Sequence, residues 1–275
     1  MRFPPRIIPL ALGCALAAVL GACDPQPTGS SAGPPSPPAI VSSTATTCAP
    51  PECDRIVATV ELAWTPTTSP IVGYRVLRDG EEIASLPAIG PASTSLVDRS
   101  AVIGATHRYE VVAVAEDGAR AAAAPTDVAV PLPPLEAAQV EGAFAVRRTV
   151  IRAVNLRALA GIADPRPGLR SDSVWTLVAA CPPAVGACDV RWNGHPGVIS
   201  PSGRVYQGVS SAGSARCPDG TRVAAPIRLR LRVISAEVVG GAWVASRIRG
   251  RLASSFRCSG FAPSSGVARF TGARR

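Results

Sequence analysis

Apolar and polar residues alternate with a period of two in short stretches between residues 37 and 132. Val60, Leu62 and Trp64, for example, fall on one face of such a stretch. This period is typical of β-strands that bury one face against a core. The stretches are separated by turn-forming residues, among them Asp79-Gly80, which suits a tight hairpin turn because both positions tolerate positive φ. This region therefore predicts a domain of seven short strands.

The region from 135 to 275 shows the same alternation and sustains no helical period. Neighbouring strands with short connections favour an antiparallel meander, which closes as a small barrel or folds as a sandwich. The whole protein is therefore predicted to be all-β. The candidate strands of this second domain are residues 140–154, 174–179, 189–192, 204–209, 222–239, 243–256 and 267–271.

The chain begins with a segment typical of exported proteins. Arg2 and Arg6 precede an apolar run over residues 7–20, and the small pair Gly21-Ala22 stands before Cys23. These are the parts of a secretory signal peptide, and the apolar run is too short to span a bilayer. The ending at Cys23 resembles the lipobox of bacterial lipoproteins.

The lipoprotein resemblance implies that residues 1–22 are removed and that Cys23 carries two acyl chains. Two chains would hold the protein on the outer face of the cell membrane. Residues 23–36 are rich in Pro, Gly and Ser and predict a tether without a core. The alternative is an ordinary cleaved signal peptide and a secreted protein in which Cys23 is incidental.

Three segments of the first domain, residues 37–132, carry a family resemblance. They are Leu62-Ala-Trp64-Thr-Pro66, Gly73-Tyr74-Arg-Val76-Leu-Arg78-Asp79-Gly80 and Tyr109-Glu-Val-Val-Ala-Val. Together they resemble a bacterial fibronectin type III domain, which is a sandwich of two sheets. The resemblance implies that Trp64 is buried between the sheets and that the Tyr109 hydroxyl bonds to the upstream backbone as a tyrosine corner. Such modules are often spacers, and the fold alone implies no activity.

Residues 135–275 are similar to uncharacterised β-rich domains of secreted actinobacterial proteins. The similarity lies in Val174-Trp175-Thr-Leu with the cysteines that follow it, and in the segment Gly241-Ala-Trp243-Val-Ala-Ser-Arg-Ile-Arg-Gly250. It implies no known activity.

An even number of cysteines, six, remains after the signal peptide and the lipobox. In an exported chain this predicts disulfides. Spacing favours the pairs Cys48–Cys53, Cys181–Cys188 and Cys217–Cys258, and other pairings within the second domain stay open. A zinc site is disfavoured because the chain has no Cys-x₂-Cys pair and only two histidines, so no metal is expected.

Charge divides the two domains. Residues 36–133 hold six arginines and eleven acids, a net charge of −5, whereas residues 134–275 hold twenty arginines and seven acids, a net charge of +13. The basic residues are all arginine, so chemistry that needs lysine, such as Schiff bases, Ser-Lys dyads and P-loops, is excluded.

Alternating arginines in two consecutive strands form the sharpest pattern in the basic domain. A turn at Gly240-Gly241 pairs the two strands so that Arg232 lies opposite Arg249 and Arg230 opposite Arg251. One face then carries six arginines, namely Arg228, Arg230, Arg232, Arg247, Arg249 and Arg251. Since like charges directly across strands are destabilising, we expect an anionic ligand there. The alternative is a solvated surface that binds nothing.

No residue pattern indicates catalysis, and neither an active site nor a cofactor is predicted. His107 is expected at the strand surface of the first domain, and His195 lies near Asp189 without a nucleophile motif around it. Nucleic acid ranks low as a partner because no outward aromatic platform is evident.

The sequence thus favours a non-enzymatic, membrane-anchored lipoprotein whose basic domain binds anionic polymers or headgroups of the cell envelope. A carbohydrate-binding accessory module is one alternative, and it requires Trp175, Trp192 or Trp243 to form an exposed stacking surface. A lipocalin-like carrier of small apolar ligands is another, and it requires a hollow barrel with those tryptophans inside. The oligomeric state is not predicted.

Overall fold

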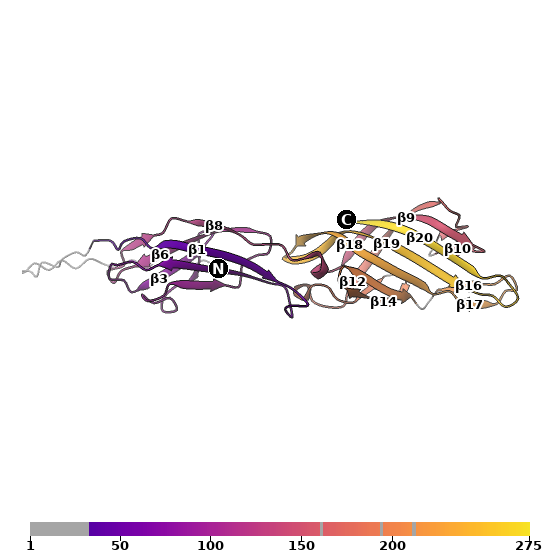
Figure 1. Cartoon of the computed structure of the whole chain (residues 1–275), viewed down its shortest axis with the longest axis horizontal. Coiled ribbons are helices and arrows are strands. Elements are labelled where there is room, and N and C mark those ends of the chain that lie inside the picture. Colours follow the sequence, from indigo (N-terminus) through magenta and orange to yellow (C-terminus); the bar gives the residue numbers. More distant parts are fainter. Residues whose placement is uncertain (1–32, 160–161, 193–194, 211–212) are drawn as a thin grey trace, which may run out of the picture. The chain divides into compact units, whose positions relative to one another are not determined.

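The computed structural model describes residues 33–159, 162–192, 195–210 and 213–275 (Figure 1). Within these residues the protein contains strands and two 3₁₀ turns but no α-helix, which confirms the all-β prediction. None of the described segments is a helix long and apolar enough to cross a membrane. The predicted signal peptide, Cys23 and most of the tether lie outside the described residues.

Two antiparallel sheets form the part of the chain before residue 130. The first has the order β1-β2-β5 and consists of β1 (Ala39–Cys48), β2 (Val57–Thr65) and β5 (Ser95–Asp98). The second has the order β4-β3-β6-β7, and β8 also pairs with β6. Its strands are β3 (Gly73–Arg78), β4 (Glu81–Ala84), β6 (Thr106–Val114), β7 (Arg120–Ala122) and β8 (Thr126–Ala129).

The core of this region lies between the two sheets. Val60, Leu62 and Trp64 on β2 are all buried, as their alternation predicted. Trp64 meets Tyr74 of the other sheet edge to face, with ring centroids 5.5 Å apart. Tyr109 on β6 is also fully buried. The large aromatic side chains therefore join the sheets, as expected of side chains that bury the most area.

Eight antiparallel strands close into a barrel between residues 142 and 274. In order around the ring they are β12 (Arg170–Ala179), β13 (Val190–Trp192), β14 (His195–Ser202), β15 (Val205–Ser210), β18 (Ile227–Val239), β19 (Ala242–Phe256), β20 (Ser264–Arg274) and β9 (Gly142–Val154). β9 bonds to β12 on one edge and to β20 on the other, which completes the ring. Of the two architectures that the sequence allowed, the barrel is the one observed.

Short elements connect the barrel strands. Two small hairpins occur, β10 with β11 and β16 with β17. These elements and the two 3₁₀ turns are β10 (Ala158–Leu159), β11 (Ile162–Ala163), β16 (Ser214–Arg216), β17 (Arg222–Ala224), η1 (Leu135–Ala137) and η2 (Pro183–Val185).

Aromatic rings occupy the barrel core. Trp175 lies 4.7 Å from Trp192 and 4.6 Å from Phe270 between ring centroids. Trp243 is also buried, and its indole N–H donates to the carbonyl of Pro134 at 3.1 Å. None of these tryptophans forms the exposed stacking surface that the carbohydrate-binding alternative required. Trp175 and Trp192 do lie inside the barrel, as a carrier would need, but they pack against each other.

Three disulfides form as the spacing favoured. They are Cys48–Cys53, Cys181–Cys188 and Cys217–Cys258, with Cα atoms 5.9, 6.2 and 5.7 Å apart. The first two close short loops, whereas the third ties the β16–β17 hairpin to the connection after β19 across 41 positions. In the chain-entropy model this long loop contributes about 4 kcal/mol, more than either short one.

Candidate functional site

The β18–β19 hairpin has the predicted register. Gly240 and Gly241 both have positive φ, 57° and 81°, and form the two-residue turn. Arg232 accordingly pairs with Arg249, and Arg230 pairs with Arg251. The intervening apolar residues face the core, and the arginines face outward. The predicted arginine face is therefore present.

Closure of the barrel extends this face across three more strands. We define the first row as Arg230, Arg251, Arg269, Thr149 and Arg170, which are consecutive cross-strand partners from β18 to β12. We define the second row as Arg232, Arg249, Thr271, Arg147 and Asp172 on the same five strands. The two rows run in parallel across the outer surface of the barrel.

A groove of about 730 Å³ lies along these rows. Leu231, Gly250 and Phe270 lie between the two rows, at positions that face the barrel interior. The floor of the groove is therefore formed by backbone atoms. A Cβ atom on Gly250 would lie 2.6 Å from the Phe270 ring and 2.2 Å from the Arg230 carbonyl oxygen. Glycine is therefore needed where the ring packs beneath the floor.

The groove is strongly positive. Seven arginines line it, namely Arg147, Arg170, Arg230, Arg232, Arg249, Arg251 and Arg269. Arg147 bonds to Asp172 at 3.0 Å, but both side chains are about 70% exposed, so the pair contributes little. The other six form no ion pair with any residue that the structure describes.

The field of the arginines reaches a neighbouring carboxylate. Glu136 on η1 accepts a hydrogen bond from Arg204, and this bond is the main reason why the pKa of Glu136 lies below its ordinary value. The charge of Arg232 lowers the same pKa further. An anion entering the groove would experience the same attraction from the second row.

Four of the six predicted arginines lie in the groove, and two do not. Arg228 lines a separate small hollow with Arg152, and Arg247 lines an adjoining hollow with Arg275. Sequence reasoning missed the arginines of β9, β12 and β20 and the two threonines, namely Arg147, Arg170, Arg269, Thr149 and Thr271. Arg269 and Thr271 flank an apolar residue, which marks them as outward-facing, but the run Arg147-Arg148-Thr149 does not alternate, because Arg148 is the buried position. No local turn shows that these strands adjoin β19.

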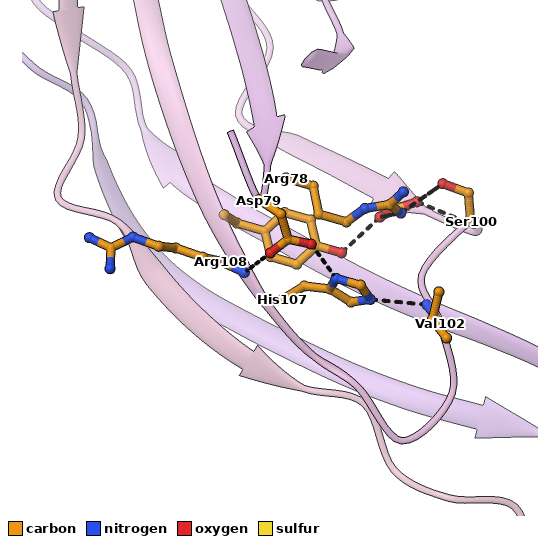
Figure 2. Close-up of polar contacts among 8 residues, drawn as sticks. Arg78, Asp79, Ser100, Val102, His107 and Arg108 are labelled. Carbon is orange, nitrogen blue, oxygen red and sulfur yellow. Dashed lines mark hydrogen bonds and ion pairs between the residues drawn. The ribbon is translucent and has the colours of Figure 1, made fainter. Parts of the chain in front are cut away.

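A second polar cluster lies in the sheets before residue 130 (Figure 2). Asp98 accepts hydrogen bonds from Arg78 at 2.8 Å, from the hydroxyl and backbone N–H of Ser100 at 2.7 and 2.8 Å, and from the Tyr109 hydroxyl at 2.7 Å. The predicted backbone acceptor for Tyr109 is therefore wrong, because a buried carboxylate takes its place. Burial alone raises the pKa of Asp98, yet the hydrogen bonds outweigh burial and hold it below its ordinary value.

His107 belongs to the same part of the structure, and the prediction that it lies on the surface is wrong. It is buried, and its Nε2 atom accepts the backbone N–H of Val102 at 3.0 Å (Figure 2). Nδ1 therefore carries the hydrogen atom and donates a hydrogen bond to Asp79 at 2.6 Å. Asp79 in turn accepts the N–H of Arg108 at 2.9 Å. Both ring nitrogens are engaged in holding turns together.

Outside these two clusters the described residues offer little further chemistry. They contain no group of three or more His, Cys, Asp or Glu side chains suited to a metal ion. His195 begins strand β14. Comparison with protein-family models, curated proteins and solved structures found no match.

Proposed function

We propose that this protein is a non-enzymatic lipoprotein that binds anionic polymers or headgroups of the cell envelope in the arginine groove. One observation carries the proposal: six of the seven arginines in the groove form no ion pair with any residue that the structure describes, and among these six only Arg232 acts on a nearby carboxylate, Glu136. Side-by-side guanidinium groups repel one another, and an anion bound between them relieves that repulsion.

An address outside the cytoplasm is supported by the chain's cysteines and by its first residues. Three disulfides form within the described part of the chain, and disulfides persist in oxidising compartments. The segment that ends at Cys23 resembles a lipobox. In this proposal the two acyl chains on Cys23 hold the protein on the outer face of the cell membrane, and residues 24–36 tether it there.

Residues 37–132 are proposed to be a fibronectin type III spacer. Its support is the pair of sheets in the orders β1-β2-β5 and β4-β3-β6-β7, with Trp64 buried between them. The two polar side chains of its buried cluster are already hydrogen-bonded within the domain, Asp98 to Ser100 and His107 to Val102 and Asp79. These hydrogen bonds stabilise the fold and leave neither side chain available to a ligand, as expected of a spacer.

Co-sedimentation with purified cell envelope tests the proposed function. The processed chain, residues 23–275, would carry Cys23→Ser, so that neither the apolar run of residues 7–20 nor an acylated Cys23 contributes to sedimentation. We expect binding at low salt that disappears at high salt, because exposed charges are screened there. Binding to a neutral polysaccharide that resists salt would contradict the proposal.

A matched pair of variants locates the binding. The groove variant replaces four arginines that line the groove, namely Arg230, Arg232, Arg249 and Arg251, by serine. The control variant replaces four exposed arginines outside the groove, namely Arg152, Arg191, Arg216 and Arg228, by serine. Both lose the same charge, so only a site in the groove predicts that the first variant loses binding and the second keeps it.

A further inference from the structure

The two rows give the groove a direction. Each of the five strands from β18 to β12 places one residue in each row. Adjacent strands are about 4.8 Å apart and the rows are two residues apart along each strand, so the groove is about 19 Å long and 7 Å wide. It is a narrow channel that crosses the strands.

Every strand contributes at least one arginine to this channel. β18 and β19 have an arginine in both rows, whereas β20 has Arg269 facing Thr271 and β9 has Arg147 facing Thr149. β12 adds Arg170 at the end of the first row, whereas the second row ends in Asp172, which pairs with Arg147. A single small anion reaches two or three guanidinium groups and leaves the rest unpaired. Positive charge repeated about every 5 Å calls for negative charge repeated along one ligand.

Resting on the proposed function, we propose that the groove binds one extended chain of a linear phosphodiester polymer with small polar linkers. The polymer lies across the strands, with its phosphates between the two rows. A phosphodiester carries its charge within the chain and projects its two free oxygens to both sides. Donors stand on both walls of the groove, including the hydroxyls of Thr149 and Thr271. A polyuronate, by contrast, carries its charge on pendant carboxylates outside the chain of linkages.

The lining disfavours two other polyanions. Single-stranded nucleic acids are held by aromatic side chains on which the bases stack. Phe270, the one aromatic residue of the groove lining, turns its ring into the barrel and is only 3% exposed. A bilayer presents its phosphates on a plane, which would touch the tips of the arginines but not the floor.

Chain length provides the decisive test. The processed chain, residues 23–275 with Cys23→Ser, would be titrated with glycerol-phosphate oligomers of increasing length by isothermal titration calorimetry. We expect the affinity to rise about tenfold with each repeat that gains a charged contact, and to level off once the oligomer spans about 19 Å. Equal affinity for the monomer and for a long oligomer would overturn the proposal. So would tighter binding of polygalacturonate, of single-stranded DNA of equal charge, or of phosphatidylglycerol vesicles.

Two variants separate the geometry of the site from its charge. Thr149→Val with Thr271→Val removes two donors and keeps the net charge, so the affinity for the long oligomer should fall about fivefold at an unchanged salt dependence. Arg251→Ser should weaken binding and reduce the slope of log affinity against log salt by about 0.7, whereas Arg228→Ser outside the groove should leave both unchanged. Circular dichroism melting establishes that each variant is folded.

The outcomes distinguish this inference from the proposed function. If monomer and polymer bind alike, but bind through the groove arginines and in a salt-sensitive manner, the anion-binding function stands and the extended-chain inference fails. If no anionic probe binds, or if binding does not depend on the groove arginines, both fail.

Discussion

Arginine side chains have opposite surroundings in the barrel and in the sandwich region, which consists of the two sheets of residues 39–129. In the sandwich region Arg78 bonds to buried Asp98, and Arg75 pairs with Glu82 on the neighbouring strand. In the barrel six arginines stand together along one groove and form no ion pair in the part of the chain that the structure describes. Paired arginines hold a fold together, whereas unpaired arginines are available to a ligand. The difference follows the division of acids between the two halves of the sequence.

The largest expected effect would come from breaking the pairing in the sandwich region. Asp98→Ala leaves the Tyr109 hydroxyl without its acceptor and leaves Arg78 with only the Ser100 hydroxyl, and Tyr109 is fully buried. Loss of one partner from such a cluster typically costs about 3 kcal/mol of unfolding free energy. Urea unfolding measures this loss. Asp172→Ala is the control in the barrel, where the pair is exposed and the expected change is within about 0.5 kcal/mol. If both variants lost the same unfolding free energy, the proposed difference between the buried pair of the sandwich region and the exposed pair of the barrel would be wrong.

Overpacking the groove floor should have the next largest effect. Gly250→Ala places a methyl group against the Phe270 ring and the Arg230 carbonyl, and both must shift. Such changes cost about 1 to 3 kcal/mol. Thermal unfolding would show the loss, and glycerol-phosphate binding would weaken with it if the floor shapes the groove. The control is Gly90→Ala, because neither glycine has a positive φ and a Cβ atom on Gly90 would meet no atom within 4 Å. A wild-type stability for Gly250→Ala would show that the floor is looser than described.

A smaller and graded loss of stability is expected in acid, and it should begin in the sandwich region. Hydrogen bonds hold the pKa of Asp98 below its ordinary value despite burial. Asp98 therefore contributes stability above the ordinary carboxyl pKa of about 4, and this stability is lost as the pH falls through the lower folded pKa. Hydrogen exchange of the β6 amides measures it, with the β18 amides as the internal reference. Asp98→Asn should flatten the β6 profile, and an unaltered profile would contradict the assignment.

The smallest expected effect has the opposite sign. Arg249→Glu places a carboxylate opposite Arg232 and next to Thr271 across the strands. Replacing repulsion by attraction should raise the unfolding free energy by up to about 1 kcal/mol while weakening the binding of anions. Urea unfolding and calorimetric titration on the same sample separate the two effects. A variant that loses both stability and binding would indicate that the arginines support the fold.

Local rules predicted the parts of the site that lie within one hairpin. The turn at Gly240-Gly241 determined which arginines of β18 and β19 face each other, because a two-residue turn leaves one register. Short spacing likewise selected the Cys48–Cys53 and Cys181–Cys188 pairs, which left Cys217 for Cys258. Inward alternation on β2 selected Trp64 for the core. The lipobox and the fibronectin resemblance remain predictions.

Contacts between strands that are far apart in the sequence could not be predicted from local rules. Arg269 and Arg147 enter the groove because β20 pairs with β19 on one edge and with β9 on the other, and β9 lies more than 100 residues earlier. No turn connects β9 to β20, so their register depends on closure of the whole ring. The Tyr109 acceptor was missed for a similar reason: a side chain, Asp98, replaced the backbone partner expected of a tyrosine corner. His107 lies on the same face of β6 as buried Tyr109 and Val111, so the alternation already indicated that it faces inward, and the Val102 N–H satisfies its ring there.

Ring closure also determines when the groove comes into existence during synthesis. β9 is the first barrel strand to be made and β20 the last, so β9 waits for its partner while the intervening strands are produced. A chain interrupted before residue 264 would lack Arg269 and Thr271 and would leave the edges of β9 and β19 open to other chains. Only a chain translated through β20 can display the complete groove, so ligand capture would distinguish finished molecules from fragments.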